Sequence, residues 1–244
     1  MGTARSKRGL RLAADQGQAT AAPGAAPLIG LDLQGLSLGG RAILGPIALE
    51  LRPAETLAVT GPSGIGKTTL LRVLAGLETG FAGTLTAPQR IAMVFQEPRL
   101  LPWRTARANL CLTTGIDAAR ANAALAEVGL ASLGDHFPGQ LSLGQQRRLA
   151  LARAFAAEPD ALLMDEPFVS LDPENAEEMM RLFARLRAAR QLATVLVTHV
   201  EAEAQKLASR IIRLGGAPAT IVEERPNRGA WFDLPASGVT APRS

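Results

Sequence analysis

The stretch "TLAVTGPSGIGKTT" (56–69) decides the fold of this chain. Its first part is apolar on both faces, which is typical of a buried strand in a parallel sheet. Its second part fits the phosphate-loop pattern G-x-x-x-x-G-K-[ST], whose defining places hold Gly61, Gly66, Lys67 and Thr68. The pattern of 68–77 continues as a helix. Because the motif needs a strand before it and a helix after it, we predict a nucleotide-binding P-loop.

The residue types of this loop suit a polyphosphate. Glycines let the backbone wrap closely round phosphates, and amide groups point at the anion beside a positive helix terminus. We expect Lys67 to bridge the β and γ phosphates and the Thr68 hydroxyl to ligate Mg²⁺. A Gly-rich turn without function is the alternative, but chance gives this pattern in roughly a few cases in a thousand. The expected binding residues are Gly61, Pro62, Ser63, Gly64, Ile65, Gly66, Lys67, Thr68 and Thr69.

Further strands and helices follow the same logic of alternating patterns. Three more apolar runs predict buried strands: "RIAMVFQ" (90–96), "ALLMDE" (161–166) and "TVLVTH" (194–199). Helical patterns begin after Asp117 and Asp172 as expected N-caps, and another ends before Pro159. Residues 97 to about 157 contain no strand pattern. We therefore predict an α/β fold with a mainly parallel sheet and an inserted helical subdomain at about 97–157.

An acidic strand end matches the P-loop. Asp165 closes the run "ALLMDEP" (161–167), and we expect it to hold Mg²⁺ through water, with Glu166 pointing into the same crevice. Such a pair after a strand is usually only a solvated strand end, but the P-loop about a hundred residues upstream favours function. Phosphoryl transfer has a loose transition state, so orienting the water matters more than the base strength of Glu166.

Six motifs in order now make the chain resemble the ATPase subunit of an ATP-binding-cassette (ABC) transporter over residues 28 to about 216. They are the P-loop, Gln96, "LSLGQ" (141–145), "LLMDEP" (162–167), "SLD" (170–172) and His199. The resemblance implies a P-loop NTPase core with an antiparallel β region near the N-terminus. It implies that Gln96 contacts Mg²⁺ and the attacking water, and that His199 contacts the γ-phosphate. Lys67, Glu166, Gln96 and His199 are then the expected catalytic residues, and Thr68, Gln96 and Asp165 the expected Mg²⁺ ligands.

The segment "LSLGQ" resembles the family signature that binds the γ-phosphate held by a second subunit. Ser142, Gly144 and Gln145 would make that contact, and a helix terminus there suits an anion. The resemblance thus implies two chains, a homodimer or close paralogues, packed head to tail with ATP between them. Ser170 and Asp172 would lie near this interface. We assign Arg147 and Arg148 to a solvated helix face rather than to the interface, and His136 to ordinary loop packing.

Two departures from the family pattern bear on affinity. Leu143 stands where the signature usually has Gly, which puts the loop geometry and dimer affinity in question. The family usually stacks adenine on an aromatic residue, yet this chain has no Tyr, and no Phe or Trp precedes Gly61. Leu38 or Ile43 would pack on the base instead. We expect weaker nucleotide binding than is usual in the family, by about 1 kcal/mol.

The segment "VFQEPRLLPWRTARANL" (94–110) resembles importers of nitrate, sulfonates and taurine. This implies separate transmembrane permease subunits, an extracytoplasmic solute-binding protein, and a peripheral place at the cytoplasmic face of the inner membrane. Trp103 is either a hydrophobic anchor or a permease contact. The alternatives are a soluble ABC-type ATPase outside transport, a P-loop kinase or GTPase, and an inactive cassette. A soluble ABC-type ATPase would normally have a coiled-coil insertion or a duplicated cassette, and a GTPase would have a guanine-reading motif; the sequence contains neither. An inactive cassette would have lost a catalytic residue, and here the expected catalytic residues are all present.

Composition sets the remaining bounds. No apolar run reaches the roughly 18 residues of a membrane span. The net charge of +4 is concentrated in residues 1–27, which we predict to be a disordered basic tail, so the nearly neutral remainder does not suggest a nucleic-acid partner. Residues 217–244 are predicted to be an irregular tail. The single cysteine, Cys111, forms no disulfide within the chain, which suits a reducing cytoplasm, and is expected to be a small core residue.

Overall fold

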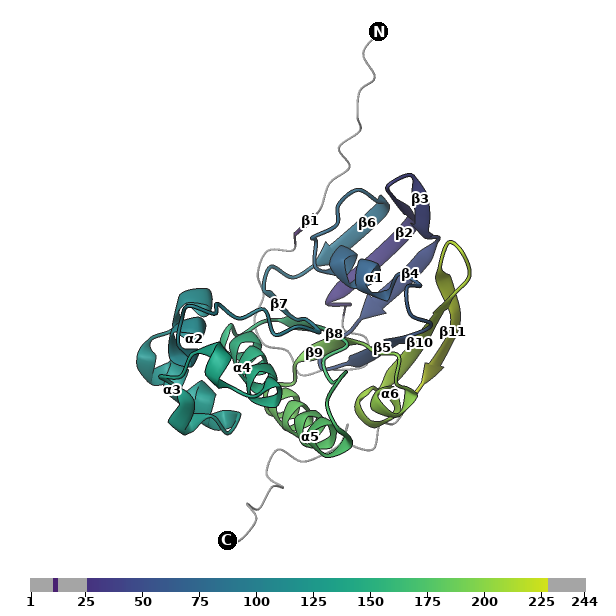
Figure 1. Ribbon diagram of the computed structural model, residues 1–244. Coiled ribbons are helices and arrows are strands. Elements are labelled where there is room, and N and C mark those ends of the chain that lie inside the picture. The colour runs from purple at the N-terminus through teal and green to yellow at the C-terminus, as the bar shows by residue number, and fades with distance from the viewer. Residues whose placement is uncertain (1–10, 13–25, 228–244) are drawn as a thin grey trace.

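A computed structural model describes residues 11–12 and 26–227 of the chain (Figure 1). Its larger sheet has the strand order β11-β10-β5-β9-β8-β7. All neighbours in this sheet are parallel except the pair β10–β11. The strands are β5 (Thr56–Thr60), β7 (Ile91–Val94), β8 (Ala161–Asp165), β9 (Ala193–Val197), β10 (Arg210–Gly215) and β11 (Thr220–Pro226).

The smaller sheet is mainly antiparallel and lies beside the larger sheet (Figure 1). Its long strand β2 pairs antiparallel with β3, β4 and β6, while β1 pairs parallel with β6. The strands are β1 (Arg11–Leu12), β2 (Ile29–Leu38), β3 (Arg41–Leu44), β4 (Ile47–Leu51) and β6 (Ala82–Ala87). The expectation of an antiparallel β region beside a mainly parallel core sheet is thereby confirmed.

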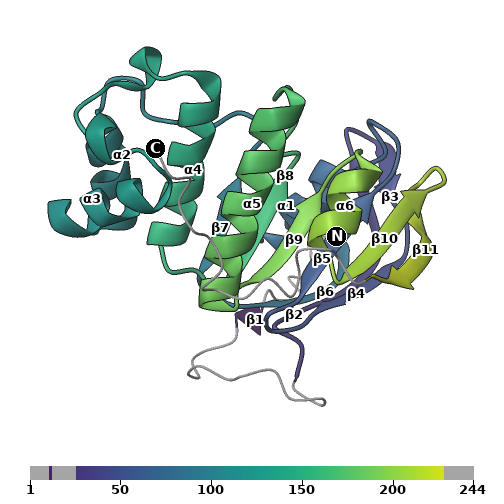
Figure 2. The same ribbon diagram turned by 90° about the horizontal axis from the view of Figure 1, so that it is seen from below.

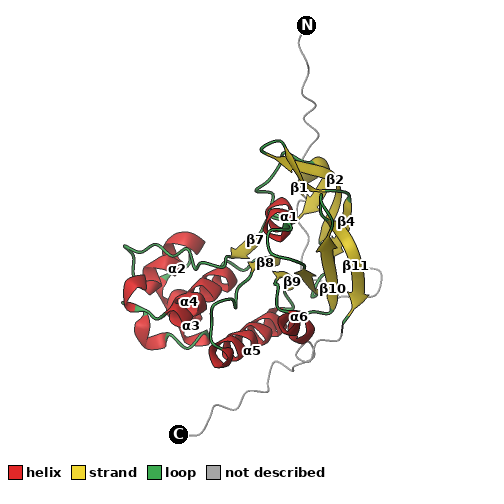
Figure 3. Ribbon diagram, turned by 45° about the vertical axis from the view of Figure 1, so that its right-hand side comes forward, coloured by secondary structure: helices red, strands yellow, loops and turns green. Residues whose placement is uncertain are grey.

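Alternation along the buried strands explains how helices cover both faces of the larger sheet. Leu162 and Met164 of β8 join a core cluster with α4 (Leu143–Ala156) and α5 (Pro173–Arg190). Ala161 and Leu163 point the other way, into a cluster that includes α1 (Lys67–Leu74) and the smaller sheet. In Figure 3, α1 accordingly lies between the two sheets. A strand buried on both faces needs no polar face, which is why its sequence reads as a continuous apolar run.

The helical segments between β7 and α4 form a lobe to one side of the sheet (Figures 1 and 2). They are α2 (Ala106–Thr114), α3 (Ala118–Glu127) and the short 3₁₀ turns at Ala131–Leu133 and Pro138–Gln140, which pack with α4. Buried Asn109 fixes the entry to α2, because its side-chain amide donates to the carbonyl groups of Leu101 and Arg104 and accepts from the Leu101 amide. The predicted N-caps are confirmed: Asp117 and Asp172 each accept a backbone amide of their helix.

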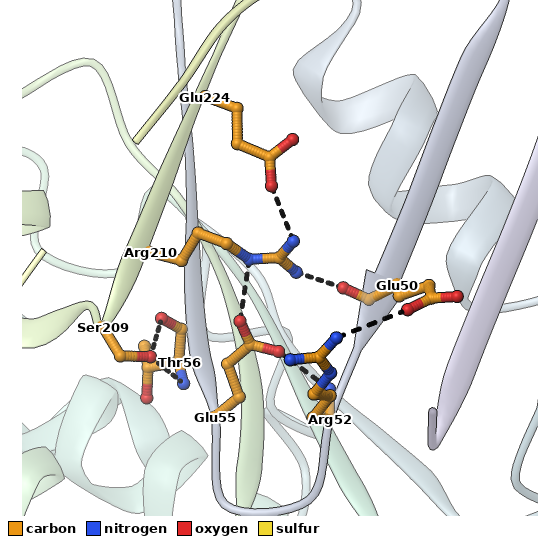
Figure 4. A network of polar contacts seen from close by, with 7 residues as sticks. All are labelled: Glu50, Arg52, Glu55, Thr56, Ser209, Arg210 and Glu224. Atoms are coloured by element: carbon orange, nitrogen blue, oxygen red, sulfur yellow. Dashed lines mark hydrogen bonds and ion pairs between the residues drawn. The ribbon is translucent and has the colours of Figure 1, made fainter. Parts of the chain in front are cut away.

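The C-terminal part differs from the sequence prediction. Residues 220–226, assigned to an irregular tail, form β11, and α6 (Glu201–Leu207) and β10 precede it. The side chain of Arg210 holds this region together: Nε contacts Glu55 Oε1 at 2.8 Å and Nη1 contacts Glu224 Oε1 at 2.7 Å (Figure 4). Strand β11 is an exposed edge strand with charged residues, so its sequence contains no apolar run from which it could be predicted. Apart from residues 11–12 and 26–27, the predicted basic tail lies outside the described residues, as does 228–244.

Candidate active site

The P-loop connects β5 to α1 in a backbone path that requires glycine. Gly61 has φ 141° and Gly66 has φ 112°, values that L side chains rarely adopt. A Cβ on Gly61 would lie 2.8 Å from the Leu214 carbonyl oxygen, and one on Gly66 would lie 2.9 Å from the Leu44 side chain. Gly66 caps α1 without a side-chain acceptor, so the first amide groups of the helix are free to meet an anion.

Lys67 is 5% exposed and lies over its own loop. Its Nζ donates to the carbonyl oxygens of Gly61 and Pro62, both at 3.0 Å, and lies 3.8 Å from Glu166 Oε1. A buried ammonium group thus lies against two carbonyl groups of the P-loop. Such a group can transfer its hydrogen bonds to phosphate oxygens without a large movement of the chain.

Glu166 and His199 face the same place from the ends of neighbouring strands. Glu166 has φ 47° and its amide donates to the Val197 carbonyl at 2.9 Å, which turns the chain sharply after β8. His199 Nδ1 lies 3.2 Å from Glu166 Oε1. Both residues line a cleft of about 440 Å³ together with Thr60, Gly61, Pro62, Ser63, Glu201 and Arg213. Three of the four residues expected to be catalytic are therefore brought together.

Asp165 and Thr68 place two side-chain oxygen atoms next to each other at the start of α1. Thr68 Oγ1 donates to Asp165 Oδ1 at 3.1 Å, and Asp165 is buried. Burial raises the pKa of Asp165, against the hydrogen bond from Thr68, and nearby Glu166 raises it further; the positive charges of Arg72 and Lys67 lower it. A cation placed there would favour the charged carboxylate. Adjacent hydroxyl and carboxylate oxygens, next to a phosphate-binding helix terminus, fit Mg²⁺.

Gln96 stands at the adjoining strand end. It follows β7 by two residues, and β7 pairs with β8 at Val94 and Met164, so the chain enters the same edge of the sheet as Asp165. Its side chain is exposed, and among residues 26–227 no hydrogen bond is recorded for it. The structure therefore leaves Gln96 available to a ligand but gives it no fixed partner.

The signature segment lies elsewhere in the chain. Ser142 caps α4: its Oγ accepts from the Gln145 amide, and Gln145 Oε1 accepts from the Ser142 amide, at 3.2 and 2.9 Å. Neither Ser142, Gly144 nor Gln145 lines the P-loop cleft; they begin α4 in the helical lobe (Figure 2). Within one chain, then, the two candidate phosphate-binding elements are separate, as a site shared between two chains requires.

Leu143 does not disturb this local geometry. It is the first residue of α4, its side chain is exposed, and the capping hydrogen bonds on either side of it are intact. Nearby, Ser170 has a left-handed φ of 60°, and Asp172 caps α5, where its hydrogen bonds with Asn175 lower its pKa. Both lie on the loop that follows Glu166.

The prediction for Arg147 is wrong. Instead of facing solvent, Arg147 is 6% exposed and lies among apolar side chains that include Phe95 and Phe168. Burial lowers the pKa of its guanidinium. The helix turns this position toward the sheet, which a helical pattern read from sequence could not distinguish from a boundary position. Arg148 is partly exposed and pairs with Glu178 at 2.6 Å.

The other residues discussed in the sequence analysis differ in how far they are buried. Leu38 is 38% exposed at the end of β2, and Ile43 packs against Gly66. Trp103 is 67% exposed, so it is not a buried anchor. Cys111 is partly buried against the core of the helical lobe, and His136 is partly buried in a loop. Sequence reasoning missed Arg213 of the cleft, because it failed to predict β10; no motif marks this residue.

Comparisons with known proteins agree with one another. A profile of the ABC transporter family matches residues 44–169. The aliphatic sulfonates import ATP-binding protein SsuB 3 of Nocardia farcinica is 47% identical over 182 residues, covering 74% of each chain. SsuB of Granulibacter bethesdensis is 43% identical over 208 residues, covering 83% of this chain and 87% of its own. The dimeric ATP-binding cassette MJ0796, in a post-hydrolysis state with ADP and Pi, has a TM-score of 0.73 at 28% identity, over 82% of this chain and 99% of that one.

Proposed function

The chain belongs to the ABC transporter family, and from that premise we propose that it binds and hydrolyses ATP to drive the import of aliphatic sulfonates through separate permease subunits. The observation that carries the ATPase activity is the meeting of three side chains: Glu166 Oε1 lies 3.8 Å from Lys67 Nζ and 3.2 Å from His199 Nδ1. Glu166 and His199 line the cleft beside the P-loop. The sulfonate class is supported by the import proteins to which the chain is similar. The segment 94–110 also suggests nitrate, which is the competing substrate, and taurine, which is itself an aliphatic sulfonate.

In the proposed reaction, the P-loop amide groups and Lys67 hold the β and γ phosphates. Lys67 exchanges its bonds to the Gly61 and Pro62 carbonyls for phosphate oxygens. Glu166 accepts a hydrogen bond from the attacking water, and His199 contacts the γ-phosphate. The water oxygen bonds to the γ-phosphorus as the bond to the bridging oxygen breaks, giving ADP and phosphate. Orientation and charge stabilisation carry this step.

We propose that Thr68 and Asp165 hold Mg²⁺, with Gln96 as a further ligand. When bound, the ion would neutralise charge on the β and γ phosphates. The support is the donor set itself: a buried carboxylate and a hydroxyl already lie 3.1 Å apart. Burial raises the pKa of Asp165, so a bound cation would offset the cost of keeping this carboxylate ionised.

We propose a head-to-tail dimer in which Ser142, Gly144 and Gln145 complete the partner's site. Two observations support it: the signature lies away from the P-loop cleft of its own chain, and the similar cassette MJ0796 is dimeric. Ser142 Oγ would exchange its contact with the Gln145 amide for one with the phosphate. The partner is a second copy or a close paralogue.

We propose a peripheral position at the cytoplasmic face of the membrane, beside permease subunits and, through them, an extracytoplasmic solute-binding protein. Within the described part of the chain, no helix has the length and apolar character needed to cross a bilayer. Exposed Trp103, in the turn before α2, and exposed Leu112 of α2 offer apolar contact area to a partner.

The solution mass of Glu166→Gln, measured with Mg²⁺-ATP and with ADP, tests the shared site. The substitution should retain binding and block hydrolysis, so we expect a dimer with ATP and a monomer with ADP. Adding Ser142→Arg should abolish the dimer, whereas Ser132→Arg, on an exposed turn of the helical lobe, should not. An ATP-dependent dimer that survives Ser142→Arg would refute the proposed role of the signature.

Growth of the source organism separates the substrates. Cells whose only copy carries Glu166→Gln should fail to grow with ethanesulfonate as the sole sulfur source and should grow normally with sulfate. Loss of growth on nitrate alone would replace the sulfonate assignment, whereas loss of growth on taurine alone would narrow it to this one sulfonate. Unchanged growth and unchanged uptake of all three would favour a soluble ATPase outside transport.

A further inference from the structure

Glu203 is a buried carboxylate that the proposed reaction does not use. It lies in the first turn of α6 and is 7% exposed. A carboxylate withdrawn from water costs free energy unless its oxygens are hydrogen-bonded, and here burial raises the pKa of Glu203. A carboxylate kept at such a position is therefore expected to have a structural or functional role that offsets the cost of its burial.

The hydrogen-bond partner of Glu203 is the residue directly before His199. Thr198 Oγ1 donates to Glu203 Oε2 at 2.5 Å and is itself buried. A hydroxyl has one proton to donate, and because that proton goes to Glu203, its lone pairs remain to accept from the Val200 amide at 3.0 Å. The carboxylate therefore fixes the orientation of the Thr198 hydroxyl, which donates one hydrogen bond to Glu203 and accepts another from Val200, the residue after His199.

The backbone on both sides of His199 is thereby tied to rigid elements. The Thr198 amide donates to the Val59 carbonyl of β5 at 3.2 Å, and Val200 is held through the Thr198 hydroxyl. The His199 side chain is itself half exposed, and its recorded polar contact is Glu166 Oε1 at 3.2 Å. An exposed ring with one such contact depends on its backbone for its position.

We propose that Glu203 is a positioning residue: through the Thr198 hydroxyl it fixes the loop that presents His199 to Glu166 and to the γ-phosphate. Removing the carboxylate frees the Thr198 hydroxyl to rotate, releases the Val200 amide and lets the imidazole leave the reacting groups. The inference rests on the proposed ATPase reaction, but it concerns residues outside the nucleotide-binding set.

Hydrolysis of saturating Mg²⁺-ATP by the full-length chain tests this role. We expect Glu203→Leu and Thr198→Val each to lower kcat roughly tenfold, as loss of an outer-shell partner does, with the Kd for ATP unchanged. Glu203→Gln and Thr198→Ser keep an acceptor and a hydroxyl, and should retain most of the activity. Glu223→Leu, which removes an exposed carboxylate of β11, should leave kcat unchanged.

A double-mutant cycle distinguishes positioning from general destabilisation. If Glu203 acts through His199, Glu203→Leu should cause no further loss of kcat in a His199→Ala background. An equal loss in both backgrounds would overturn the proposal, as would a variant that loses ATP affinity as much as kcat.

Proton NMR provides a readout that needs no turnover, because the chain has only two histidines. In Glu203→Leu the His199 ring resonances should shift or broaden, whereas those of His136 should not. If the wild type hydrolyses no ATP, the proposed function fails while this measurement still decides the role of Glu203. Unchanged His199 resonances would refute it.

Discussion

At the scale of single residues, we propose that the nucleotide base meets an aliphatic surface at Leu38 or Ile43. Leu38 ends β2 with 38% of its surface exposed, and Ile43 packs against Gly66 of the P-loop. Neither side chain offers the flat π-face on which a base can stack. The Gly39–Gly40 turn between them has φ of 56° and 80°. Because Leu38 is already partly exposed, a larger side chain at position 38 can extend into solvent.

We therefore expect Leu38→Tyr to tighten ATP binding by about 1 kcal/mol, or roughly fivefold in Kd. Isothermal titration of the Glu166→Gln background with Mg²⁺-ATP measures this without hydrolysis. Leu112→Tyr, an exposed leucine of α2, is the matched control and should leave Kd unchanged. Equal ATP affinity with and without the Leu38→Tyr substitution would place the base elsewhere.

The buried carboxylate of Glu203 makes the stability of the fold depend on pH. Burial raises its pKa from the ordinary value of 4.5, opposed by the Thr198 hydrogen bond and the His199 charge and reinforced by Glu166. As pH rises, the Glu203 carboxyl therefore loses its proton in the unfolded chain before it does so in the folded chain. Ionisation then stabilises the unfolded chain, so the free energy of unfolding decreases as pH rises from 4.5 to the higher pKa of the folded state.

Glu203→Gln cannot ionise, so it escapes that loss. The difference in unfolding free energy, variant minus wild type, should increase from about pH 4 to about pH 8, since other titrating groups cancel in the difference. Urea unfolding without nucleotide at both pH values measures it. A difference that is constant, or that decreases with pH, would contradict a raised pKa.

At the scale of elements, Arg210 joins three strands of the molecule. Its guanidinium bonds Glu55 before β5, Glu224 of β11 and the Glu50 carbonyl of β4 (Figure 4). Glu55 is only 14% exposed in its side chain, so losing Arg210 would leave a largely buried charge unpaired.

Arg210→Met should lower the free energy of unfolding by about 2 kcal/mol, with packing of the side-chain stem retained. Glu224→Gln loses only an exposed partner and should cost less than about 1 kcal/mol. Chemical denaturation compares the two, and the Kd for ATP should be unchanged in both. Equal costs would mean that burial of Glu55 is not the source of the effect.

The same elements explain what the sequence could predict. Strands β5, β8 and β9 are buried on both faces, so their apolar runs predict them. Lys67, Glu166 and His199 follow these strands, and their positions could therefore be predicted as well. Strand β11 is an exposed edge with successive glutamates, and α6 has only seven residues, so neither has a periodic pattern to read. The burial of Arg147 and Glu203 depends on how helices rotate against the sheet, which local sequence does not encode.

At the scale of the whole molecule, the two kinds of candidate contact lie on different parts of the chain. The P-loop cleft lies at the carboxyl ends of the parallel strands. The signature begins α4, which packs in the helical lobe, and Trp103 lies in the turn before α2. A movement of the lobe against the core would therefore move the signature together with Trp103, the proposed permease contact. This arrangement suits an ATPase that transmits force to a partner rather than acting alone.

Trp103 provides the test of this division. With 67% of its surface exposed it contributes little to the fold, but a tryptophan at the centre of an interface commonly contributes about 2 kcal/mol. Trp103→Ala should lower affinity for the permease subunits roughly thirtyfold, measured by co-purification in detergent across dilutions, and leave ATP binding by the isolated chain unchanged. Leu77→Ala removes a similarly exposed apolar side chain after α1 and should have no effect on assembly. Normal assembly of the Trp103→Ala protein would move the permease contact away from the entry to the helical lobe.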